Sequence, residues 1–189
     1  IVKEKFEHIL REIWLSLQIN SDPIQKIKNI NYNLYNVLNF KVTGGIVFDN
    51  SFILNRIMES YTGNYVTSSM LYLVLTQKLN YPVFGQMIRN SFVLSWINTK
   101  NNEDYIPYLD EKRVLFYISP FINGEIFDDN QINEFLKINN ISINPSFFRP
   151  INNIDVIAFY IKHLINAVNE KKMDVTANEL KSVLMIIEK

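Results

Sequence analysis

The chain has 189 residues, 48% of them hydrophobic and 20% charged, which is the size and composition of one folded soluble domain. Its 19 basic residues balance its 19 acidic ones, so the totals create no field that would attract nucleic acid or an anionic membrane. The absence of cysteine excludes thiolate nucleophiles and Cys-based metal sites, and no apolar run reaches the roughly 20 residues of a membrane-spanning helix. We therefore expect a cytoplasmic protein with no cofactor, no metal, and neither nucleic acid nor membrane as a partner.

Helical periodicity dominates the first third of the chain. Apolar residues recur at three- and four-residue spacing over 3–17, with Trp14 among the residues expected to face inward. Asp22-Pro23 is typical of a helix start, because proline suits the first helical turn. Shorter helices are expected over 32–39 and 51–60.

The most apolar helix is expected over 66–79, where hydrophobic residues cover much of the circumference. Such a helix is usually buried in the middle of a domain. Three strand-like runs follow, over 83–88, 91–97 and 114–118, and short or polar links join them. An antiparallel sheet is the natural arrangement, and the order of helices first and strands after favours an α+β fold.

The last third of the chain is expected to be helical again. Asp128 followed by Gln131 three residues later predicts a capping box that starts a helix. A calcium site at Asp128 is the less favoured interpretation, since the segment lacks the glycine and terminal glutamate of an EF-hand loop. Two final helices are expected over 154–169 and 175–188.

The histidines and carboxylates of this sequence form no known catalytic or metal-binding motif. His8 and His163 lie on separate expected helices, and a lone helical histidine is more often structural or at the surface than a ligand. The carboxylates of Glu103-Asp104 and Asp110-Glu111 lie in a polar link, where we expect them to be solvated rather than paired for acid–base catalysis. Residue patterns alone therefore assign no function.

Three segments taken together resemble a known family. They are 63–73 (GNYVTSSMLYL) continuing into 77–85 (QKLNYPVFG), 91–94 (SFVL) and 114–121 (VLFYISPF). In order and spacing they resemble the central helix and the next two strands of the bacterial transglutaminase-like family of the Sir B type, with its G-N-C/P-x-S-L-S-x-L-Y-L, H-F-L-V and Y-I-D-P-F patterns. Asn80 stands where that family commonly has glycine. The collinear match extends from about residue 9 to the end of the chain.

The resemblance implies a fold and a division of the chain. The fold is an α+β transglutaminase/papain-like core with N-terminal helices, a buried central helix packed on a small antiparallel sheet, and a C-terminal helical pair. Residues 1–150 would form the core with its N-terminal helices. Residues 151–189 would form a helical extension packed on the core as part of one structural unit.

The resemblance also implies that the family's catalytic residues are replaced. Active members use a cysteine thiolate that attacks an acyl carbon, a histidine that moves the proton and an aspartate that orients the imidazole. The alignment places Tyr65 at the cysteine position, Ser91 at the histidine position and Ser119 at the aspartate position. A phenol ionises near pH ~10, and serine can neither accept a proton as imidazole does nor supply a charge. We therefore expect a pseudoenzyme.

Several functions are compatible with a lost triad. The preferred one is a binding or scaffolding module, in which Asn64, Thr67 and Ser68 would join the three triad positions in a polar pocket. A competing expectation, ranked ahead of ligand binding, is that Tyr65 simply fills the former cleft. A protein partner would bind the C-terminal helices or the vestigial cleft. The alternative is a hydrolase or acyl-transferring enzyme with a relocated, non-cysteine active site.

Overall fold

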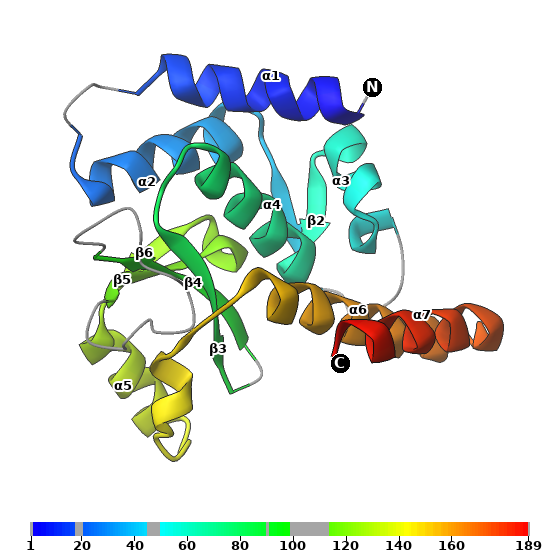
Figure 1. Cartoon of the computed structure of the whole chain (residues 1–189). Coiled ribbons are helices and arrows are strands. Elements are labelled where there is room, and N and C mark those ends of the chain that lie inside the picture. Colours follow the sequence, from blue (N-terminus) through cyan, green and yellow to red (C-terminus); the bar gives the residue numbers. More distant parts are fainter. Residues whose placement is uncertain (1, 18–20, 45–49, 90, 99–113, 189) are drawn as a thin grey trace.

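The computed structural model describes residues 2–17, 21–44, 50–89, 91–98 and 114–188. Within these segments five strands form one antiparallel sheet in the order β6-β5-β4-β3-β7, and helices lie on both of its faces (Figure 1). A parallel pair, β1 with β2, packs against the start of the central helix. The strands are β1 (Lys41–Thr43), β2 (Thr62–Asn64), β3 (Val83–Ile88), β4 (Ser91–Ile97), β5 (Val114–Ser119), β6 (Glu125–Phe127) and β7 (Pro150–Ile151).

The expected α+β class with an antiparallel sheet is confirmed. The three predicted strand runs correspond to β3, β4 and β5, which pair with one another in chain order. Strands β1, β2, β6 and β7 were not predicted, because segments of two or three residues are too short to form a recognisable strand-like run.

The N-terminal helices cover one side of the central helix. Ile9 and Ile13 of the first helix and Ile27 and Ile30 of the second are buried, as their three- and four-residue spacing requires. Trp14, which we expected to face inward, is 64% exposed, because it lies one position beyond that buried stripe. The elements are α1 (Val2–Leu15), α2 (Pro23–Asn31), the π-helical turn η1 (Tyr32–Val37), the 3-10 turn η2 (Asn50–Phe52) and α3 (Leu54–Ser60).

The central helix, α4 (Tyr65–Lys78), is buried around most of its circumference, as predicted. Its Tyr72 and Leu75 are fully buried and belong to the same hydrophobic cluster as Leu94 of β4 and Ile118 of β5. The helix therefore packs on the sheet face that carries those two strand residues. Its start, where the family's cysteine would stand, lies near the end of that sheet (Figure 1).

The opposite face of the sheet carries a smaller cluster under α5 (Asp129–Ile138). Ile132 and Leu136 of α5 pack there with Val93 and Tyr117 of the sheet. The predicted capping box at the start of α5 is confirmed: Gln131 N–H donates to Asp128 Oδ1 and Asp128 N–H donates to Gln131 Oε1, each over 2.9 Å. The 3-10 turn η5 (Pro120–Ile122) joins β5 to β6, and η6 (Pro145–Phe148) precedes β7.

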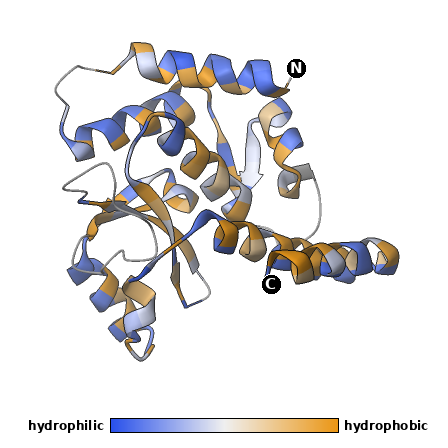
Figure 2. Cartoon of the chain, viewed as in Figure 1, coloured by the Kyte–Doolittle hydropathy of each residue, from blue (hydrophilic) through white to orange (hydrophobic). Residues whose placement is uncertain are grey.

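The two C-terminal helices, α6 (Asn153–Glu170) and α7 (Asp174–Ile187), differ in what they contact. Helix α6 packs on α4 and on β3, where Gly85 is needed because a Cβ atom would lie 2.7 Å from Val156 Cγ2. Helix α7 packs mainly on α6 and leaves apolar side chains such as Val175 and Ile186 exposed (Figure 2).

The division of the chain at residue 150 stays a prediction. In the described part of the chain, no helix has the length and apolarity needed to cross a bilayer.

Candidate functional site

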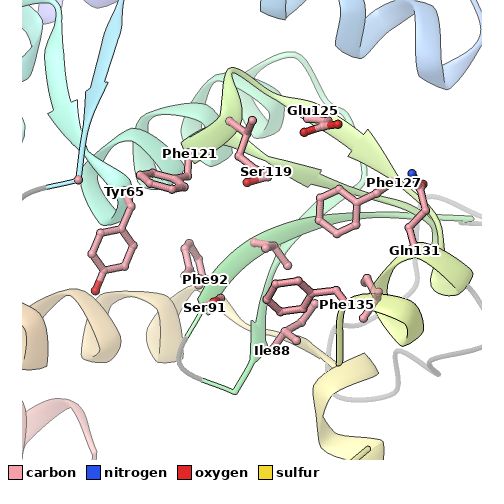
Figure 3. A pocket seen from close by; sticks show the side chains of 14 residues that line it. Tyr65, Ile88, Ser91, Phe92, Ser119, Phe121, Glu125, Phe127, Gln131 and Phe135 are labelled. Carbon is pink, nitrogen blue, oxygen red and sulfur yellow. The ribbon is translucent and has the colours of Figure 1, made fainter. Parts of the chain in front are cut away.

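A cavity of about 700 Å³ lies at the end of the sheet beside the start of α4. Its walls come from α4, the β3–β4 hairpin, β5, η5, β6 and α5, and Figure 3 shows side chains from these elements converging on it. Tyr65, Ser91 and Ser119 all line it. The side chains that the structure describes therefore leave space beside Tyr65, contrary to the expectation that the tyrosine ring fills the former cleft.

The start of α4 is built from a buried capping box. Asn64 Oδ1 accepts hydrogen bonds from the N–H groups of Val66 (2.9 Å) and Thr67 (3.0 Å). Thr67 Oγ1 accepts from Asn64 N–H over 3.0 Å and donates to the carbonyl oxygen of Ser51 over 2.7 Å. These bonds satisfy amide groups at the helix start that would otherwise be buried without partners.

The capping box corrects the expected pocket. Asn64, Thr67 and Ser68 were expected to line it with the triad positions, but all three are buried and none borders the cavity. Their polar groups face the packed interior around β2, where a Cβ atom on Gly63 would lie 2.7 Å from Ser68 Oγ and 3.0 Å from Thr67 Oγ1. These residues form the structural support of the helix start and are not part of the binding surface.

Tyr65, the first residue of α4, is held by contacts with α6. Its hydroxyl lies 2.9 Å from Nδ1 and 3.3 Å from Nε2 of His163, and the two rings meet edge to face with centroids 5.4 Å apart. The Phe121 ring packs against Tyr65 in a second edge-to-face contact at 6.5 Å. Figure 3 shows the hydroxyl directed toward α6 and away from Ser119.

The contact between Tyr65 and His163 joins two residues that the sequence analysis considered separately. The sequence carried a usable signal, because Val156, Phe159 and His163 follow helical spacing on one face of α6. Phe159 stacks on Phe92 of β4 at 5.2 Å and contacts the His163 ring at 4.3 Å, so that face is the one turned to the core. A separation of 98 residues hid the pairing.

Burial favours the neutral form of both partners of this hydrogen bond. Partial burial lowers the pKa of His163 from its ordinary 6.5, because desolvation penalises the imidazolium. It also raises the pKa of Tyr65 above 10.0, because desolvation penalises the phenolate. At neutral pH the pair therefore consists of a neutral phenol and a neutral imidazole.

Ser91 and Ser119 lie on the sheet face that is turned to α5. Leu94 pairs with Ile118 and both point to the α4 face, so alternation places Ser91 (three residues before Leu94) and Ser119 (one residue after Ile118) on the other face. Ser91 is exposed at the cavity and Ser119 is buried at its edge. In the described segments neither serine hydroxyl hydrogen-bonds to Tyr65 or to the other serine, and Phe121 lies between Tyr65 and Ser119 (Figure 3).

Glu125 is a lining residue that the sequence did not single out. It pairs directly with Ser119 across the β5–β6 ladder, so the two side chains point to the same face. Among the described residues that line the cavity, it is the only charged one, and the described residues offer it no ion pair. Glu125 was overlooked because strand β6 was not predicted. Only the pairing of β6 with β5 places Glu125 opposite Ser119.

The described residues contain no cluster of three potential metal ligands. Asp128 and Gln131 cap α5, as the preferred interpretation of that segment required. Glu103, Asp104, Asp110 and Glu111 lie outside the described residues.

Comparison with known proteins places this architecture in a family. The family model described as the transglutaminase-like superfamily matches residues 2–160, which span α1 through the first part of α6. No curated protein and no solved structure matches the chain significantly. The matched region contains the central helix, the antiparallel sheet and the cavity at the end of the sheet, with a transglutaminase-like fold. The chain belongs to the transglutaminase-like superfamily.

Proposed function

We propose that this chain is a catalytically degenerate member of the superfamily, of the Sir B type, that binds a ligand in the cavity without transforming it. The observation that carries the proposal is the open cavity of about 700 Å³ lined by all three triad positions, Tyr65, Ser91 and Ser119. A cavity of this size with apolar walls and a few polar groups has the character of a small-molecule or side-chain binding site.

The absence of catalysis is argued from the chemistry of the three side chains. Among the described residues that line the cavity, Ser91 has no histidine beside it and Ser119 faces only the Glu125 carboxylate, which is a weaker base than imidazole, so both hydroxyls stay protonated near neutral pH and are weak nucleophiles. Tyr65 has a base beside it, but its raised pKa keeps it protonated and its hydroxyl is directed toward His163 on α6. Loss of a single triad member typically costs several powers of ten in rate, and here all three positions differ from the family pattern.

The hydrogen bond between Tyr65 and His163 favours one alternative, an acyl-transferring enzyme with a relocated base. In that reaction the phenol oxygen would attack an acyl carbon while His163 takes the phenol proton. The leaving group would depart with that proton, and water would later hydrolyse the tyrosyl ester. The orientation of the hydroxyl away from the cavity and the lowered pKa of His163, which makes it a weaker base, both disfavour this alternative.

A scaffolding role through the C-terminal helices is also compatible with the sequence. Val175 and Ile186 of α7 are exposed. The described part of the chain gives no indication of what would cover them, so the proposal rests on the cavity.

The proposal is tested by a fragment screen followed by two-dimensional amide NMR. We expect fragments with an apolar body to shift the resonances of β4, β5 and α5 residues around the cavity. Ser91→Trp should abolish these shifts by filling the cavity, whereas Ser182→Trp on the exposed face of α7 should leave them unchanged. Fragments that bind equally well to the Ser91→Trp variant would contradict the proposal.

A further inference from the structure

The cavity has one apolar wall and one polar corner. Ile88, Val93, Phe127, Ile132 and Phe135 form the wall on the α5 side of the sheet. Phe135 is 52% exposed and Phe121, across the cavity, is 49% exposed. Exposed aromatic side chains grouped around a cavity indicate a surface that an apolar ligand would cover.

The polar corner is formed by Ser119 and Glu125. Because these residues pair directly across an antiparallel ladder, their Cβ atoms lie roughly 4.5–5.5 Å apart on the same face. The Ser119 hydroxyl can either donate to the carboxylate or accept a hydrogen bond from a ligand. One ligand group can therefore contact both side chains.

Among the described residues that line the cavity, none compensates the charge of Glu125. The described lining residues include no lysine, arginine or histidine, so Glu125 gives the lining a net charge of −1. Glu125 is exposed at the edge of the cavity, where its carboxylate would disfavour an anionic ligand and attract a cationic group. Salt in solution weakens but does not reverse the preference.

Aromatic rings beside Glu125 favour the same sign of charge. Phe127 lies two residues after Glu125 in β6, so both side chains point to the same face, and the Phe127 ring is stacked on Tyr117 at 5.8 Å. The stacking fixes the ring at the cavity lining, and the faces of an aromatic ring carry the negative part of its quadrupole. Aromatic faces attract ammonium and guanidinium groups within about 6 Å.

We propose that the cavity binds an organic cation, in which an apolar body lies along the Phe127–Phe135 wall and an ammonium group contacts Glu125 and Ser119. The inference rests on the proposed binding function and specifies the chemical class of its ligand.

The test uses three probes that share one apolar body and differ only in the terminal group. They are 3-phenylpropylamine, 3-phenylpropanol and 3-phenylpropionate, titrated into the full chain at pH 7 and followed by amide NMR. We expect the amine to bind about tenfold more tightly than the alcohol, the increment of one partly exposed charge pair, and the carboxylate to bind most weakly. Raising the salt concentration should reduce the advantage of the amine.

Two matched variants assign the effect to one carboxylate. Glu125→Gln should bring the affinity of the amine down to that of the alcohol without changing the affinity of the alcohol. Glu134→Gln, which removes an exposed carboxylate of α5 outside the cavity lining, should leave all three affinities unchanged. Equal effects of the two variants would overturn the assignment to Glu125.

The outcomes separate this inference from the function on which it rests. If the alcohol and the amine shift the cavity resonances with equal affinity, or if the carboxylate binds most tightly, the preference for a cation is wrong while ligand binding stands. If none of the three probes shifts a cavity resonance, the organic-cation inference is overturned, and failure of the fragment screen as well would overturn the binding function itself.

Discussion

The two faces of the five-stranded sheet differ in how completely they are covered. On the α4 face, Phe92, Leu94 and Ile118 are buried in a large cluster with α1, α2, α4 and α6. On the α5 face, the cluster around Tyr117 is smaller, and the cavity continues from it to the end of the sheet. The α4 face maintains the fold, and under the proposed function the α5 face is where a change of side chain would alter ligand binding.

The largest difference is expected from truncating one apolar side chain on each face. Leu75→Ala on α4 should lower the free energy of unfolding by about 2–5 kcal/mol, because Leu75 is fully buried and leaves a cavity. Phe135→Ala on α5 should cost less than about 1 kcal/mol, because that ring is half exposed. Urea denaturation of both variants measures the two costs. Similar losses would remove the distinction between the faces.

The two capping boxes extend the comparison to polar groups. Thr67→Val at the start of α4 should cost about 1–3 kcal/mol, because it leaves the buried Asn64 N–H and the Ser51 carbonyl oxygen without Thr67 Oγ1. Asp128→Ala at the exposed start of α5 should cost about 1 kcal/mol, a typical value for a lost cap. Thermal or urea unfolding gives both values, and a larger loss from Asp128→Ala would contradict the ranking.

A smaller effect is expected at the junction of α4 with α6. Tyr65→Phe removes the hydrogen bond to His163 but keeps the ring packed on Phe121, so it should cost about 0.5–1.5 kcal/mol. The affinity of the 3-phenylpropanol probe should not change, because the hydroxyl is directed away from the cavity. Titration of the variant by NMR checks this, and a loss of binding would place the hydroxyl in the binding site.

The smallest effect is a pH dependence of stability. Burial lowers the pKa of His163 in the folded chain, so the unfolded chain takes up this proton at higher pH, near 6.5. The contribution of neutral His163 is complete above about pH 6.5 and is lost as the pH falls from there through the lower folded pKa.

Urea denaturation at pH 8 and pH 5 should therefore show a smaller loss of stability for His163→Gln than for the unchanged chain. His8→Gln, which removes a histidine from the exposed face of α1, controls for the loss of a titrating group elsewhere. The same pH dependence of stability in the two variants would contradict a specific role for the half-buried His163 imidazole.

The structure on the α4 face of the sheet was largely predictable from the sequence, because buried helices leave periodic patterns of apolar residues. The spacing of Ile9 and Ile13, the apolar circumference of α4 and the short apolar runs of β3, β4 and β5 each follow from packing against neighbouring elements. The Asp128–Gln131 box was predictable for a similar reason, since its bonds are local.

The site was predictable only in part, because it depends on contacts between distant residues and on short strands. The resemblance placed Tyr65, Ser91 and Ser119 at one cavity, but it assigned Asn64, Thr67 and Ser68 to the wrong surroundings. It also gave no reason to bring His163 to Tyr65, a contact that depends on how α6 packs across the sheet. Glu125 needed the register of a three-residue strand.

The central claim is that the cavity binds a ligand and leaves it unchanged. The most direct measurement uses 4-(aminomethyl)phenyl acetate, a cationic activated ester, and follows the amide resonances of the protein and the release of acetate in one NMR sample. We predict shifts of cavity resonances with acetate release at the rate seen without protein. Accelerated release that disappears in Tyr65→Phe would contradict the account and establish an enzyme with a relocated active site.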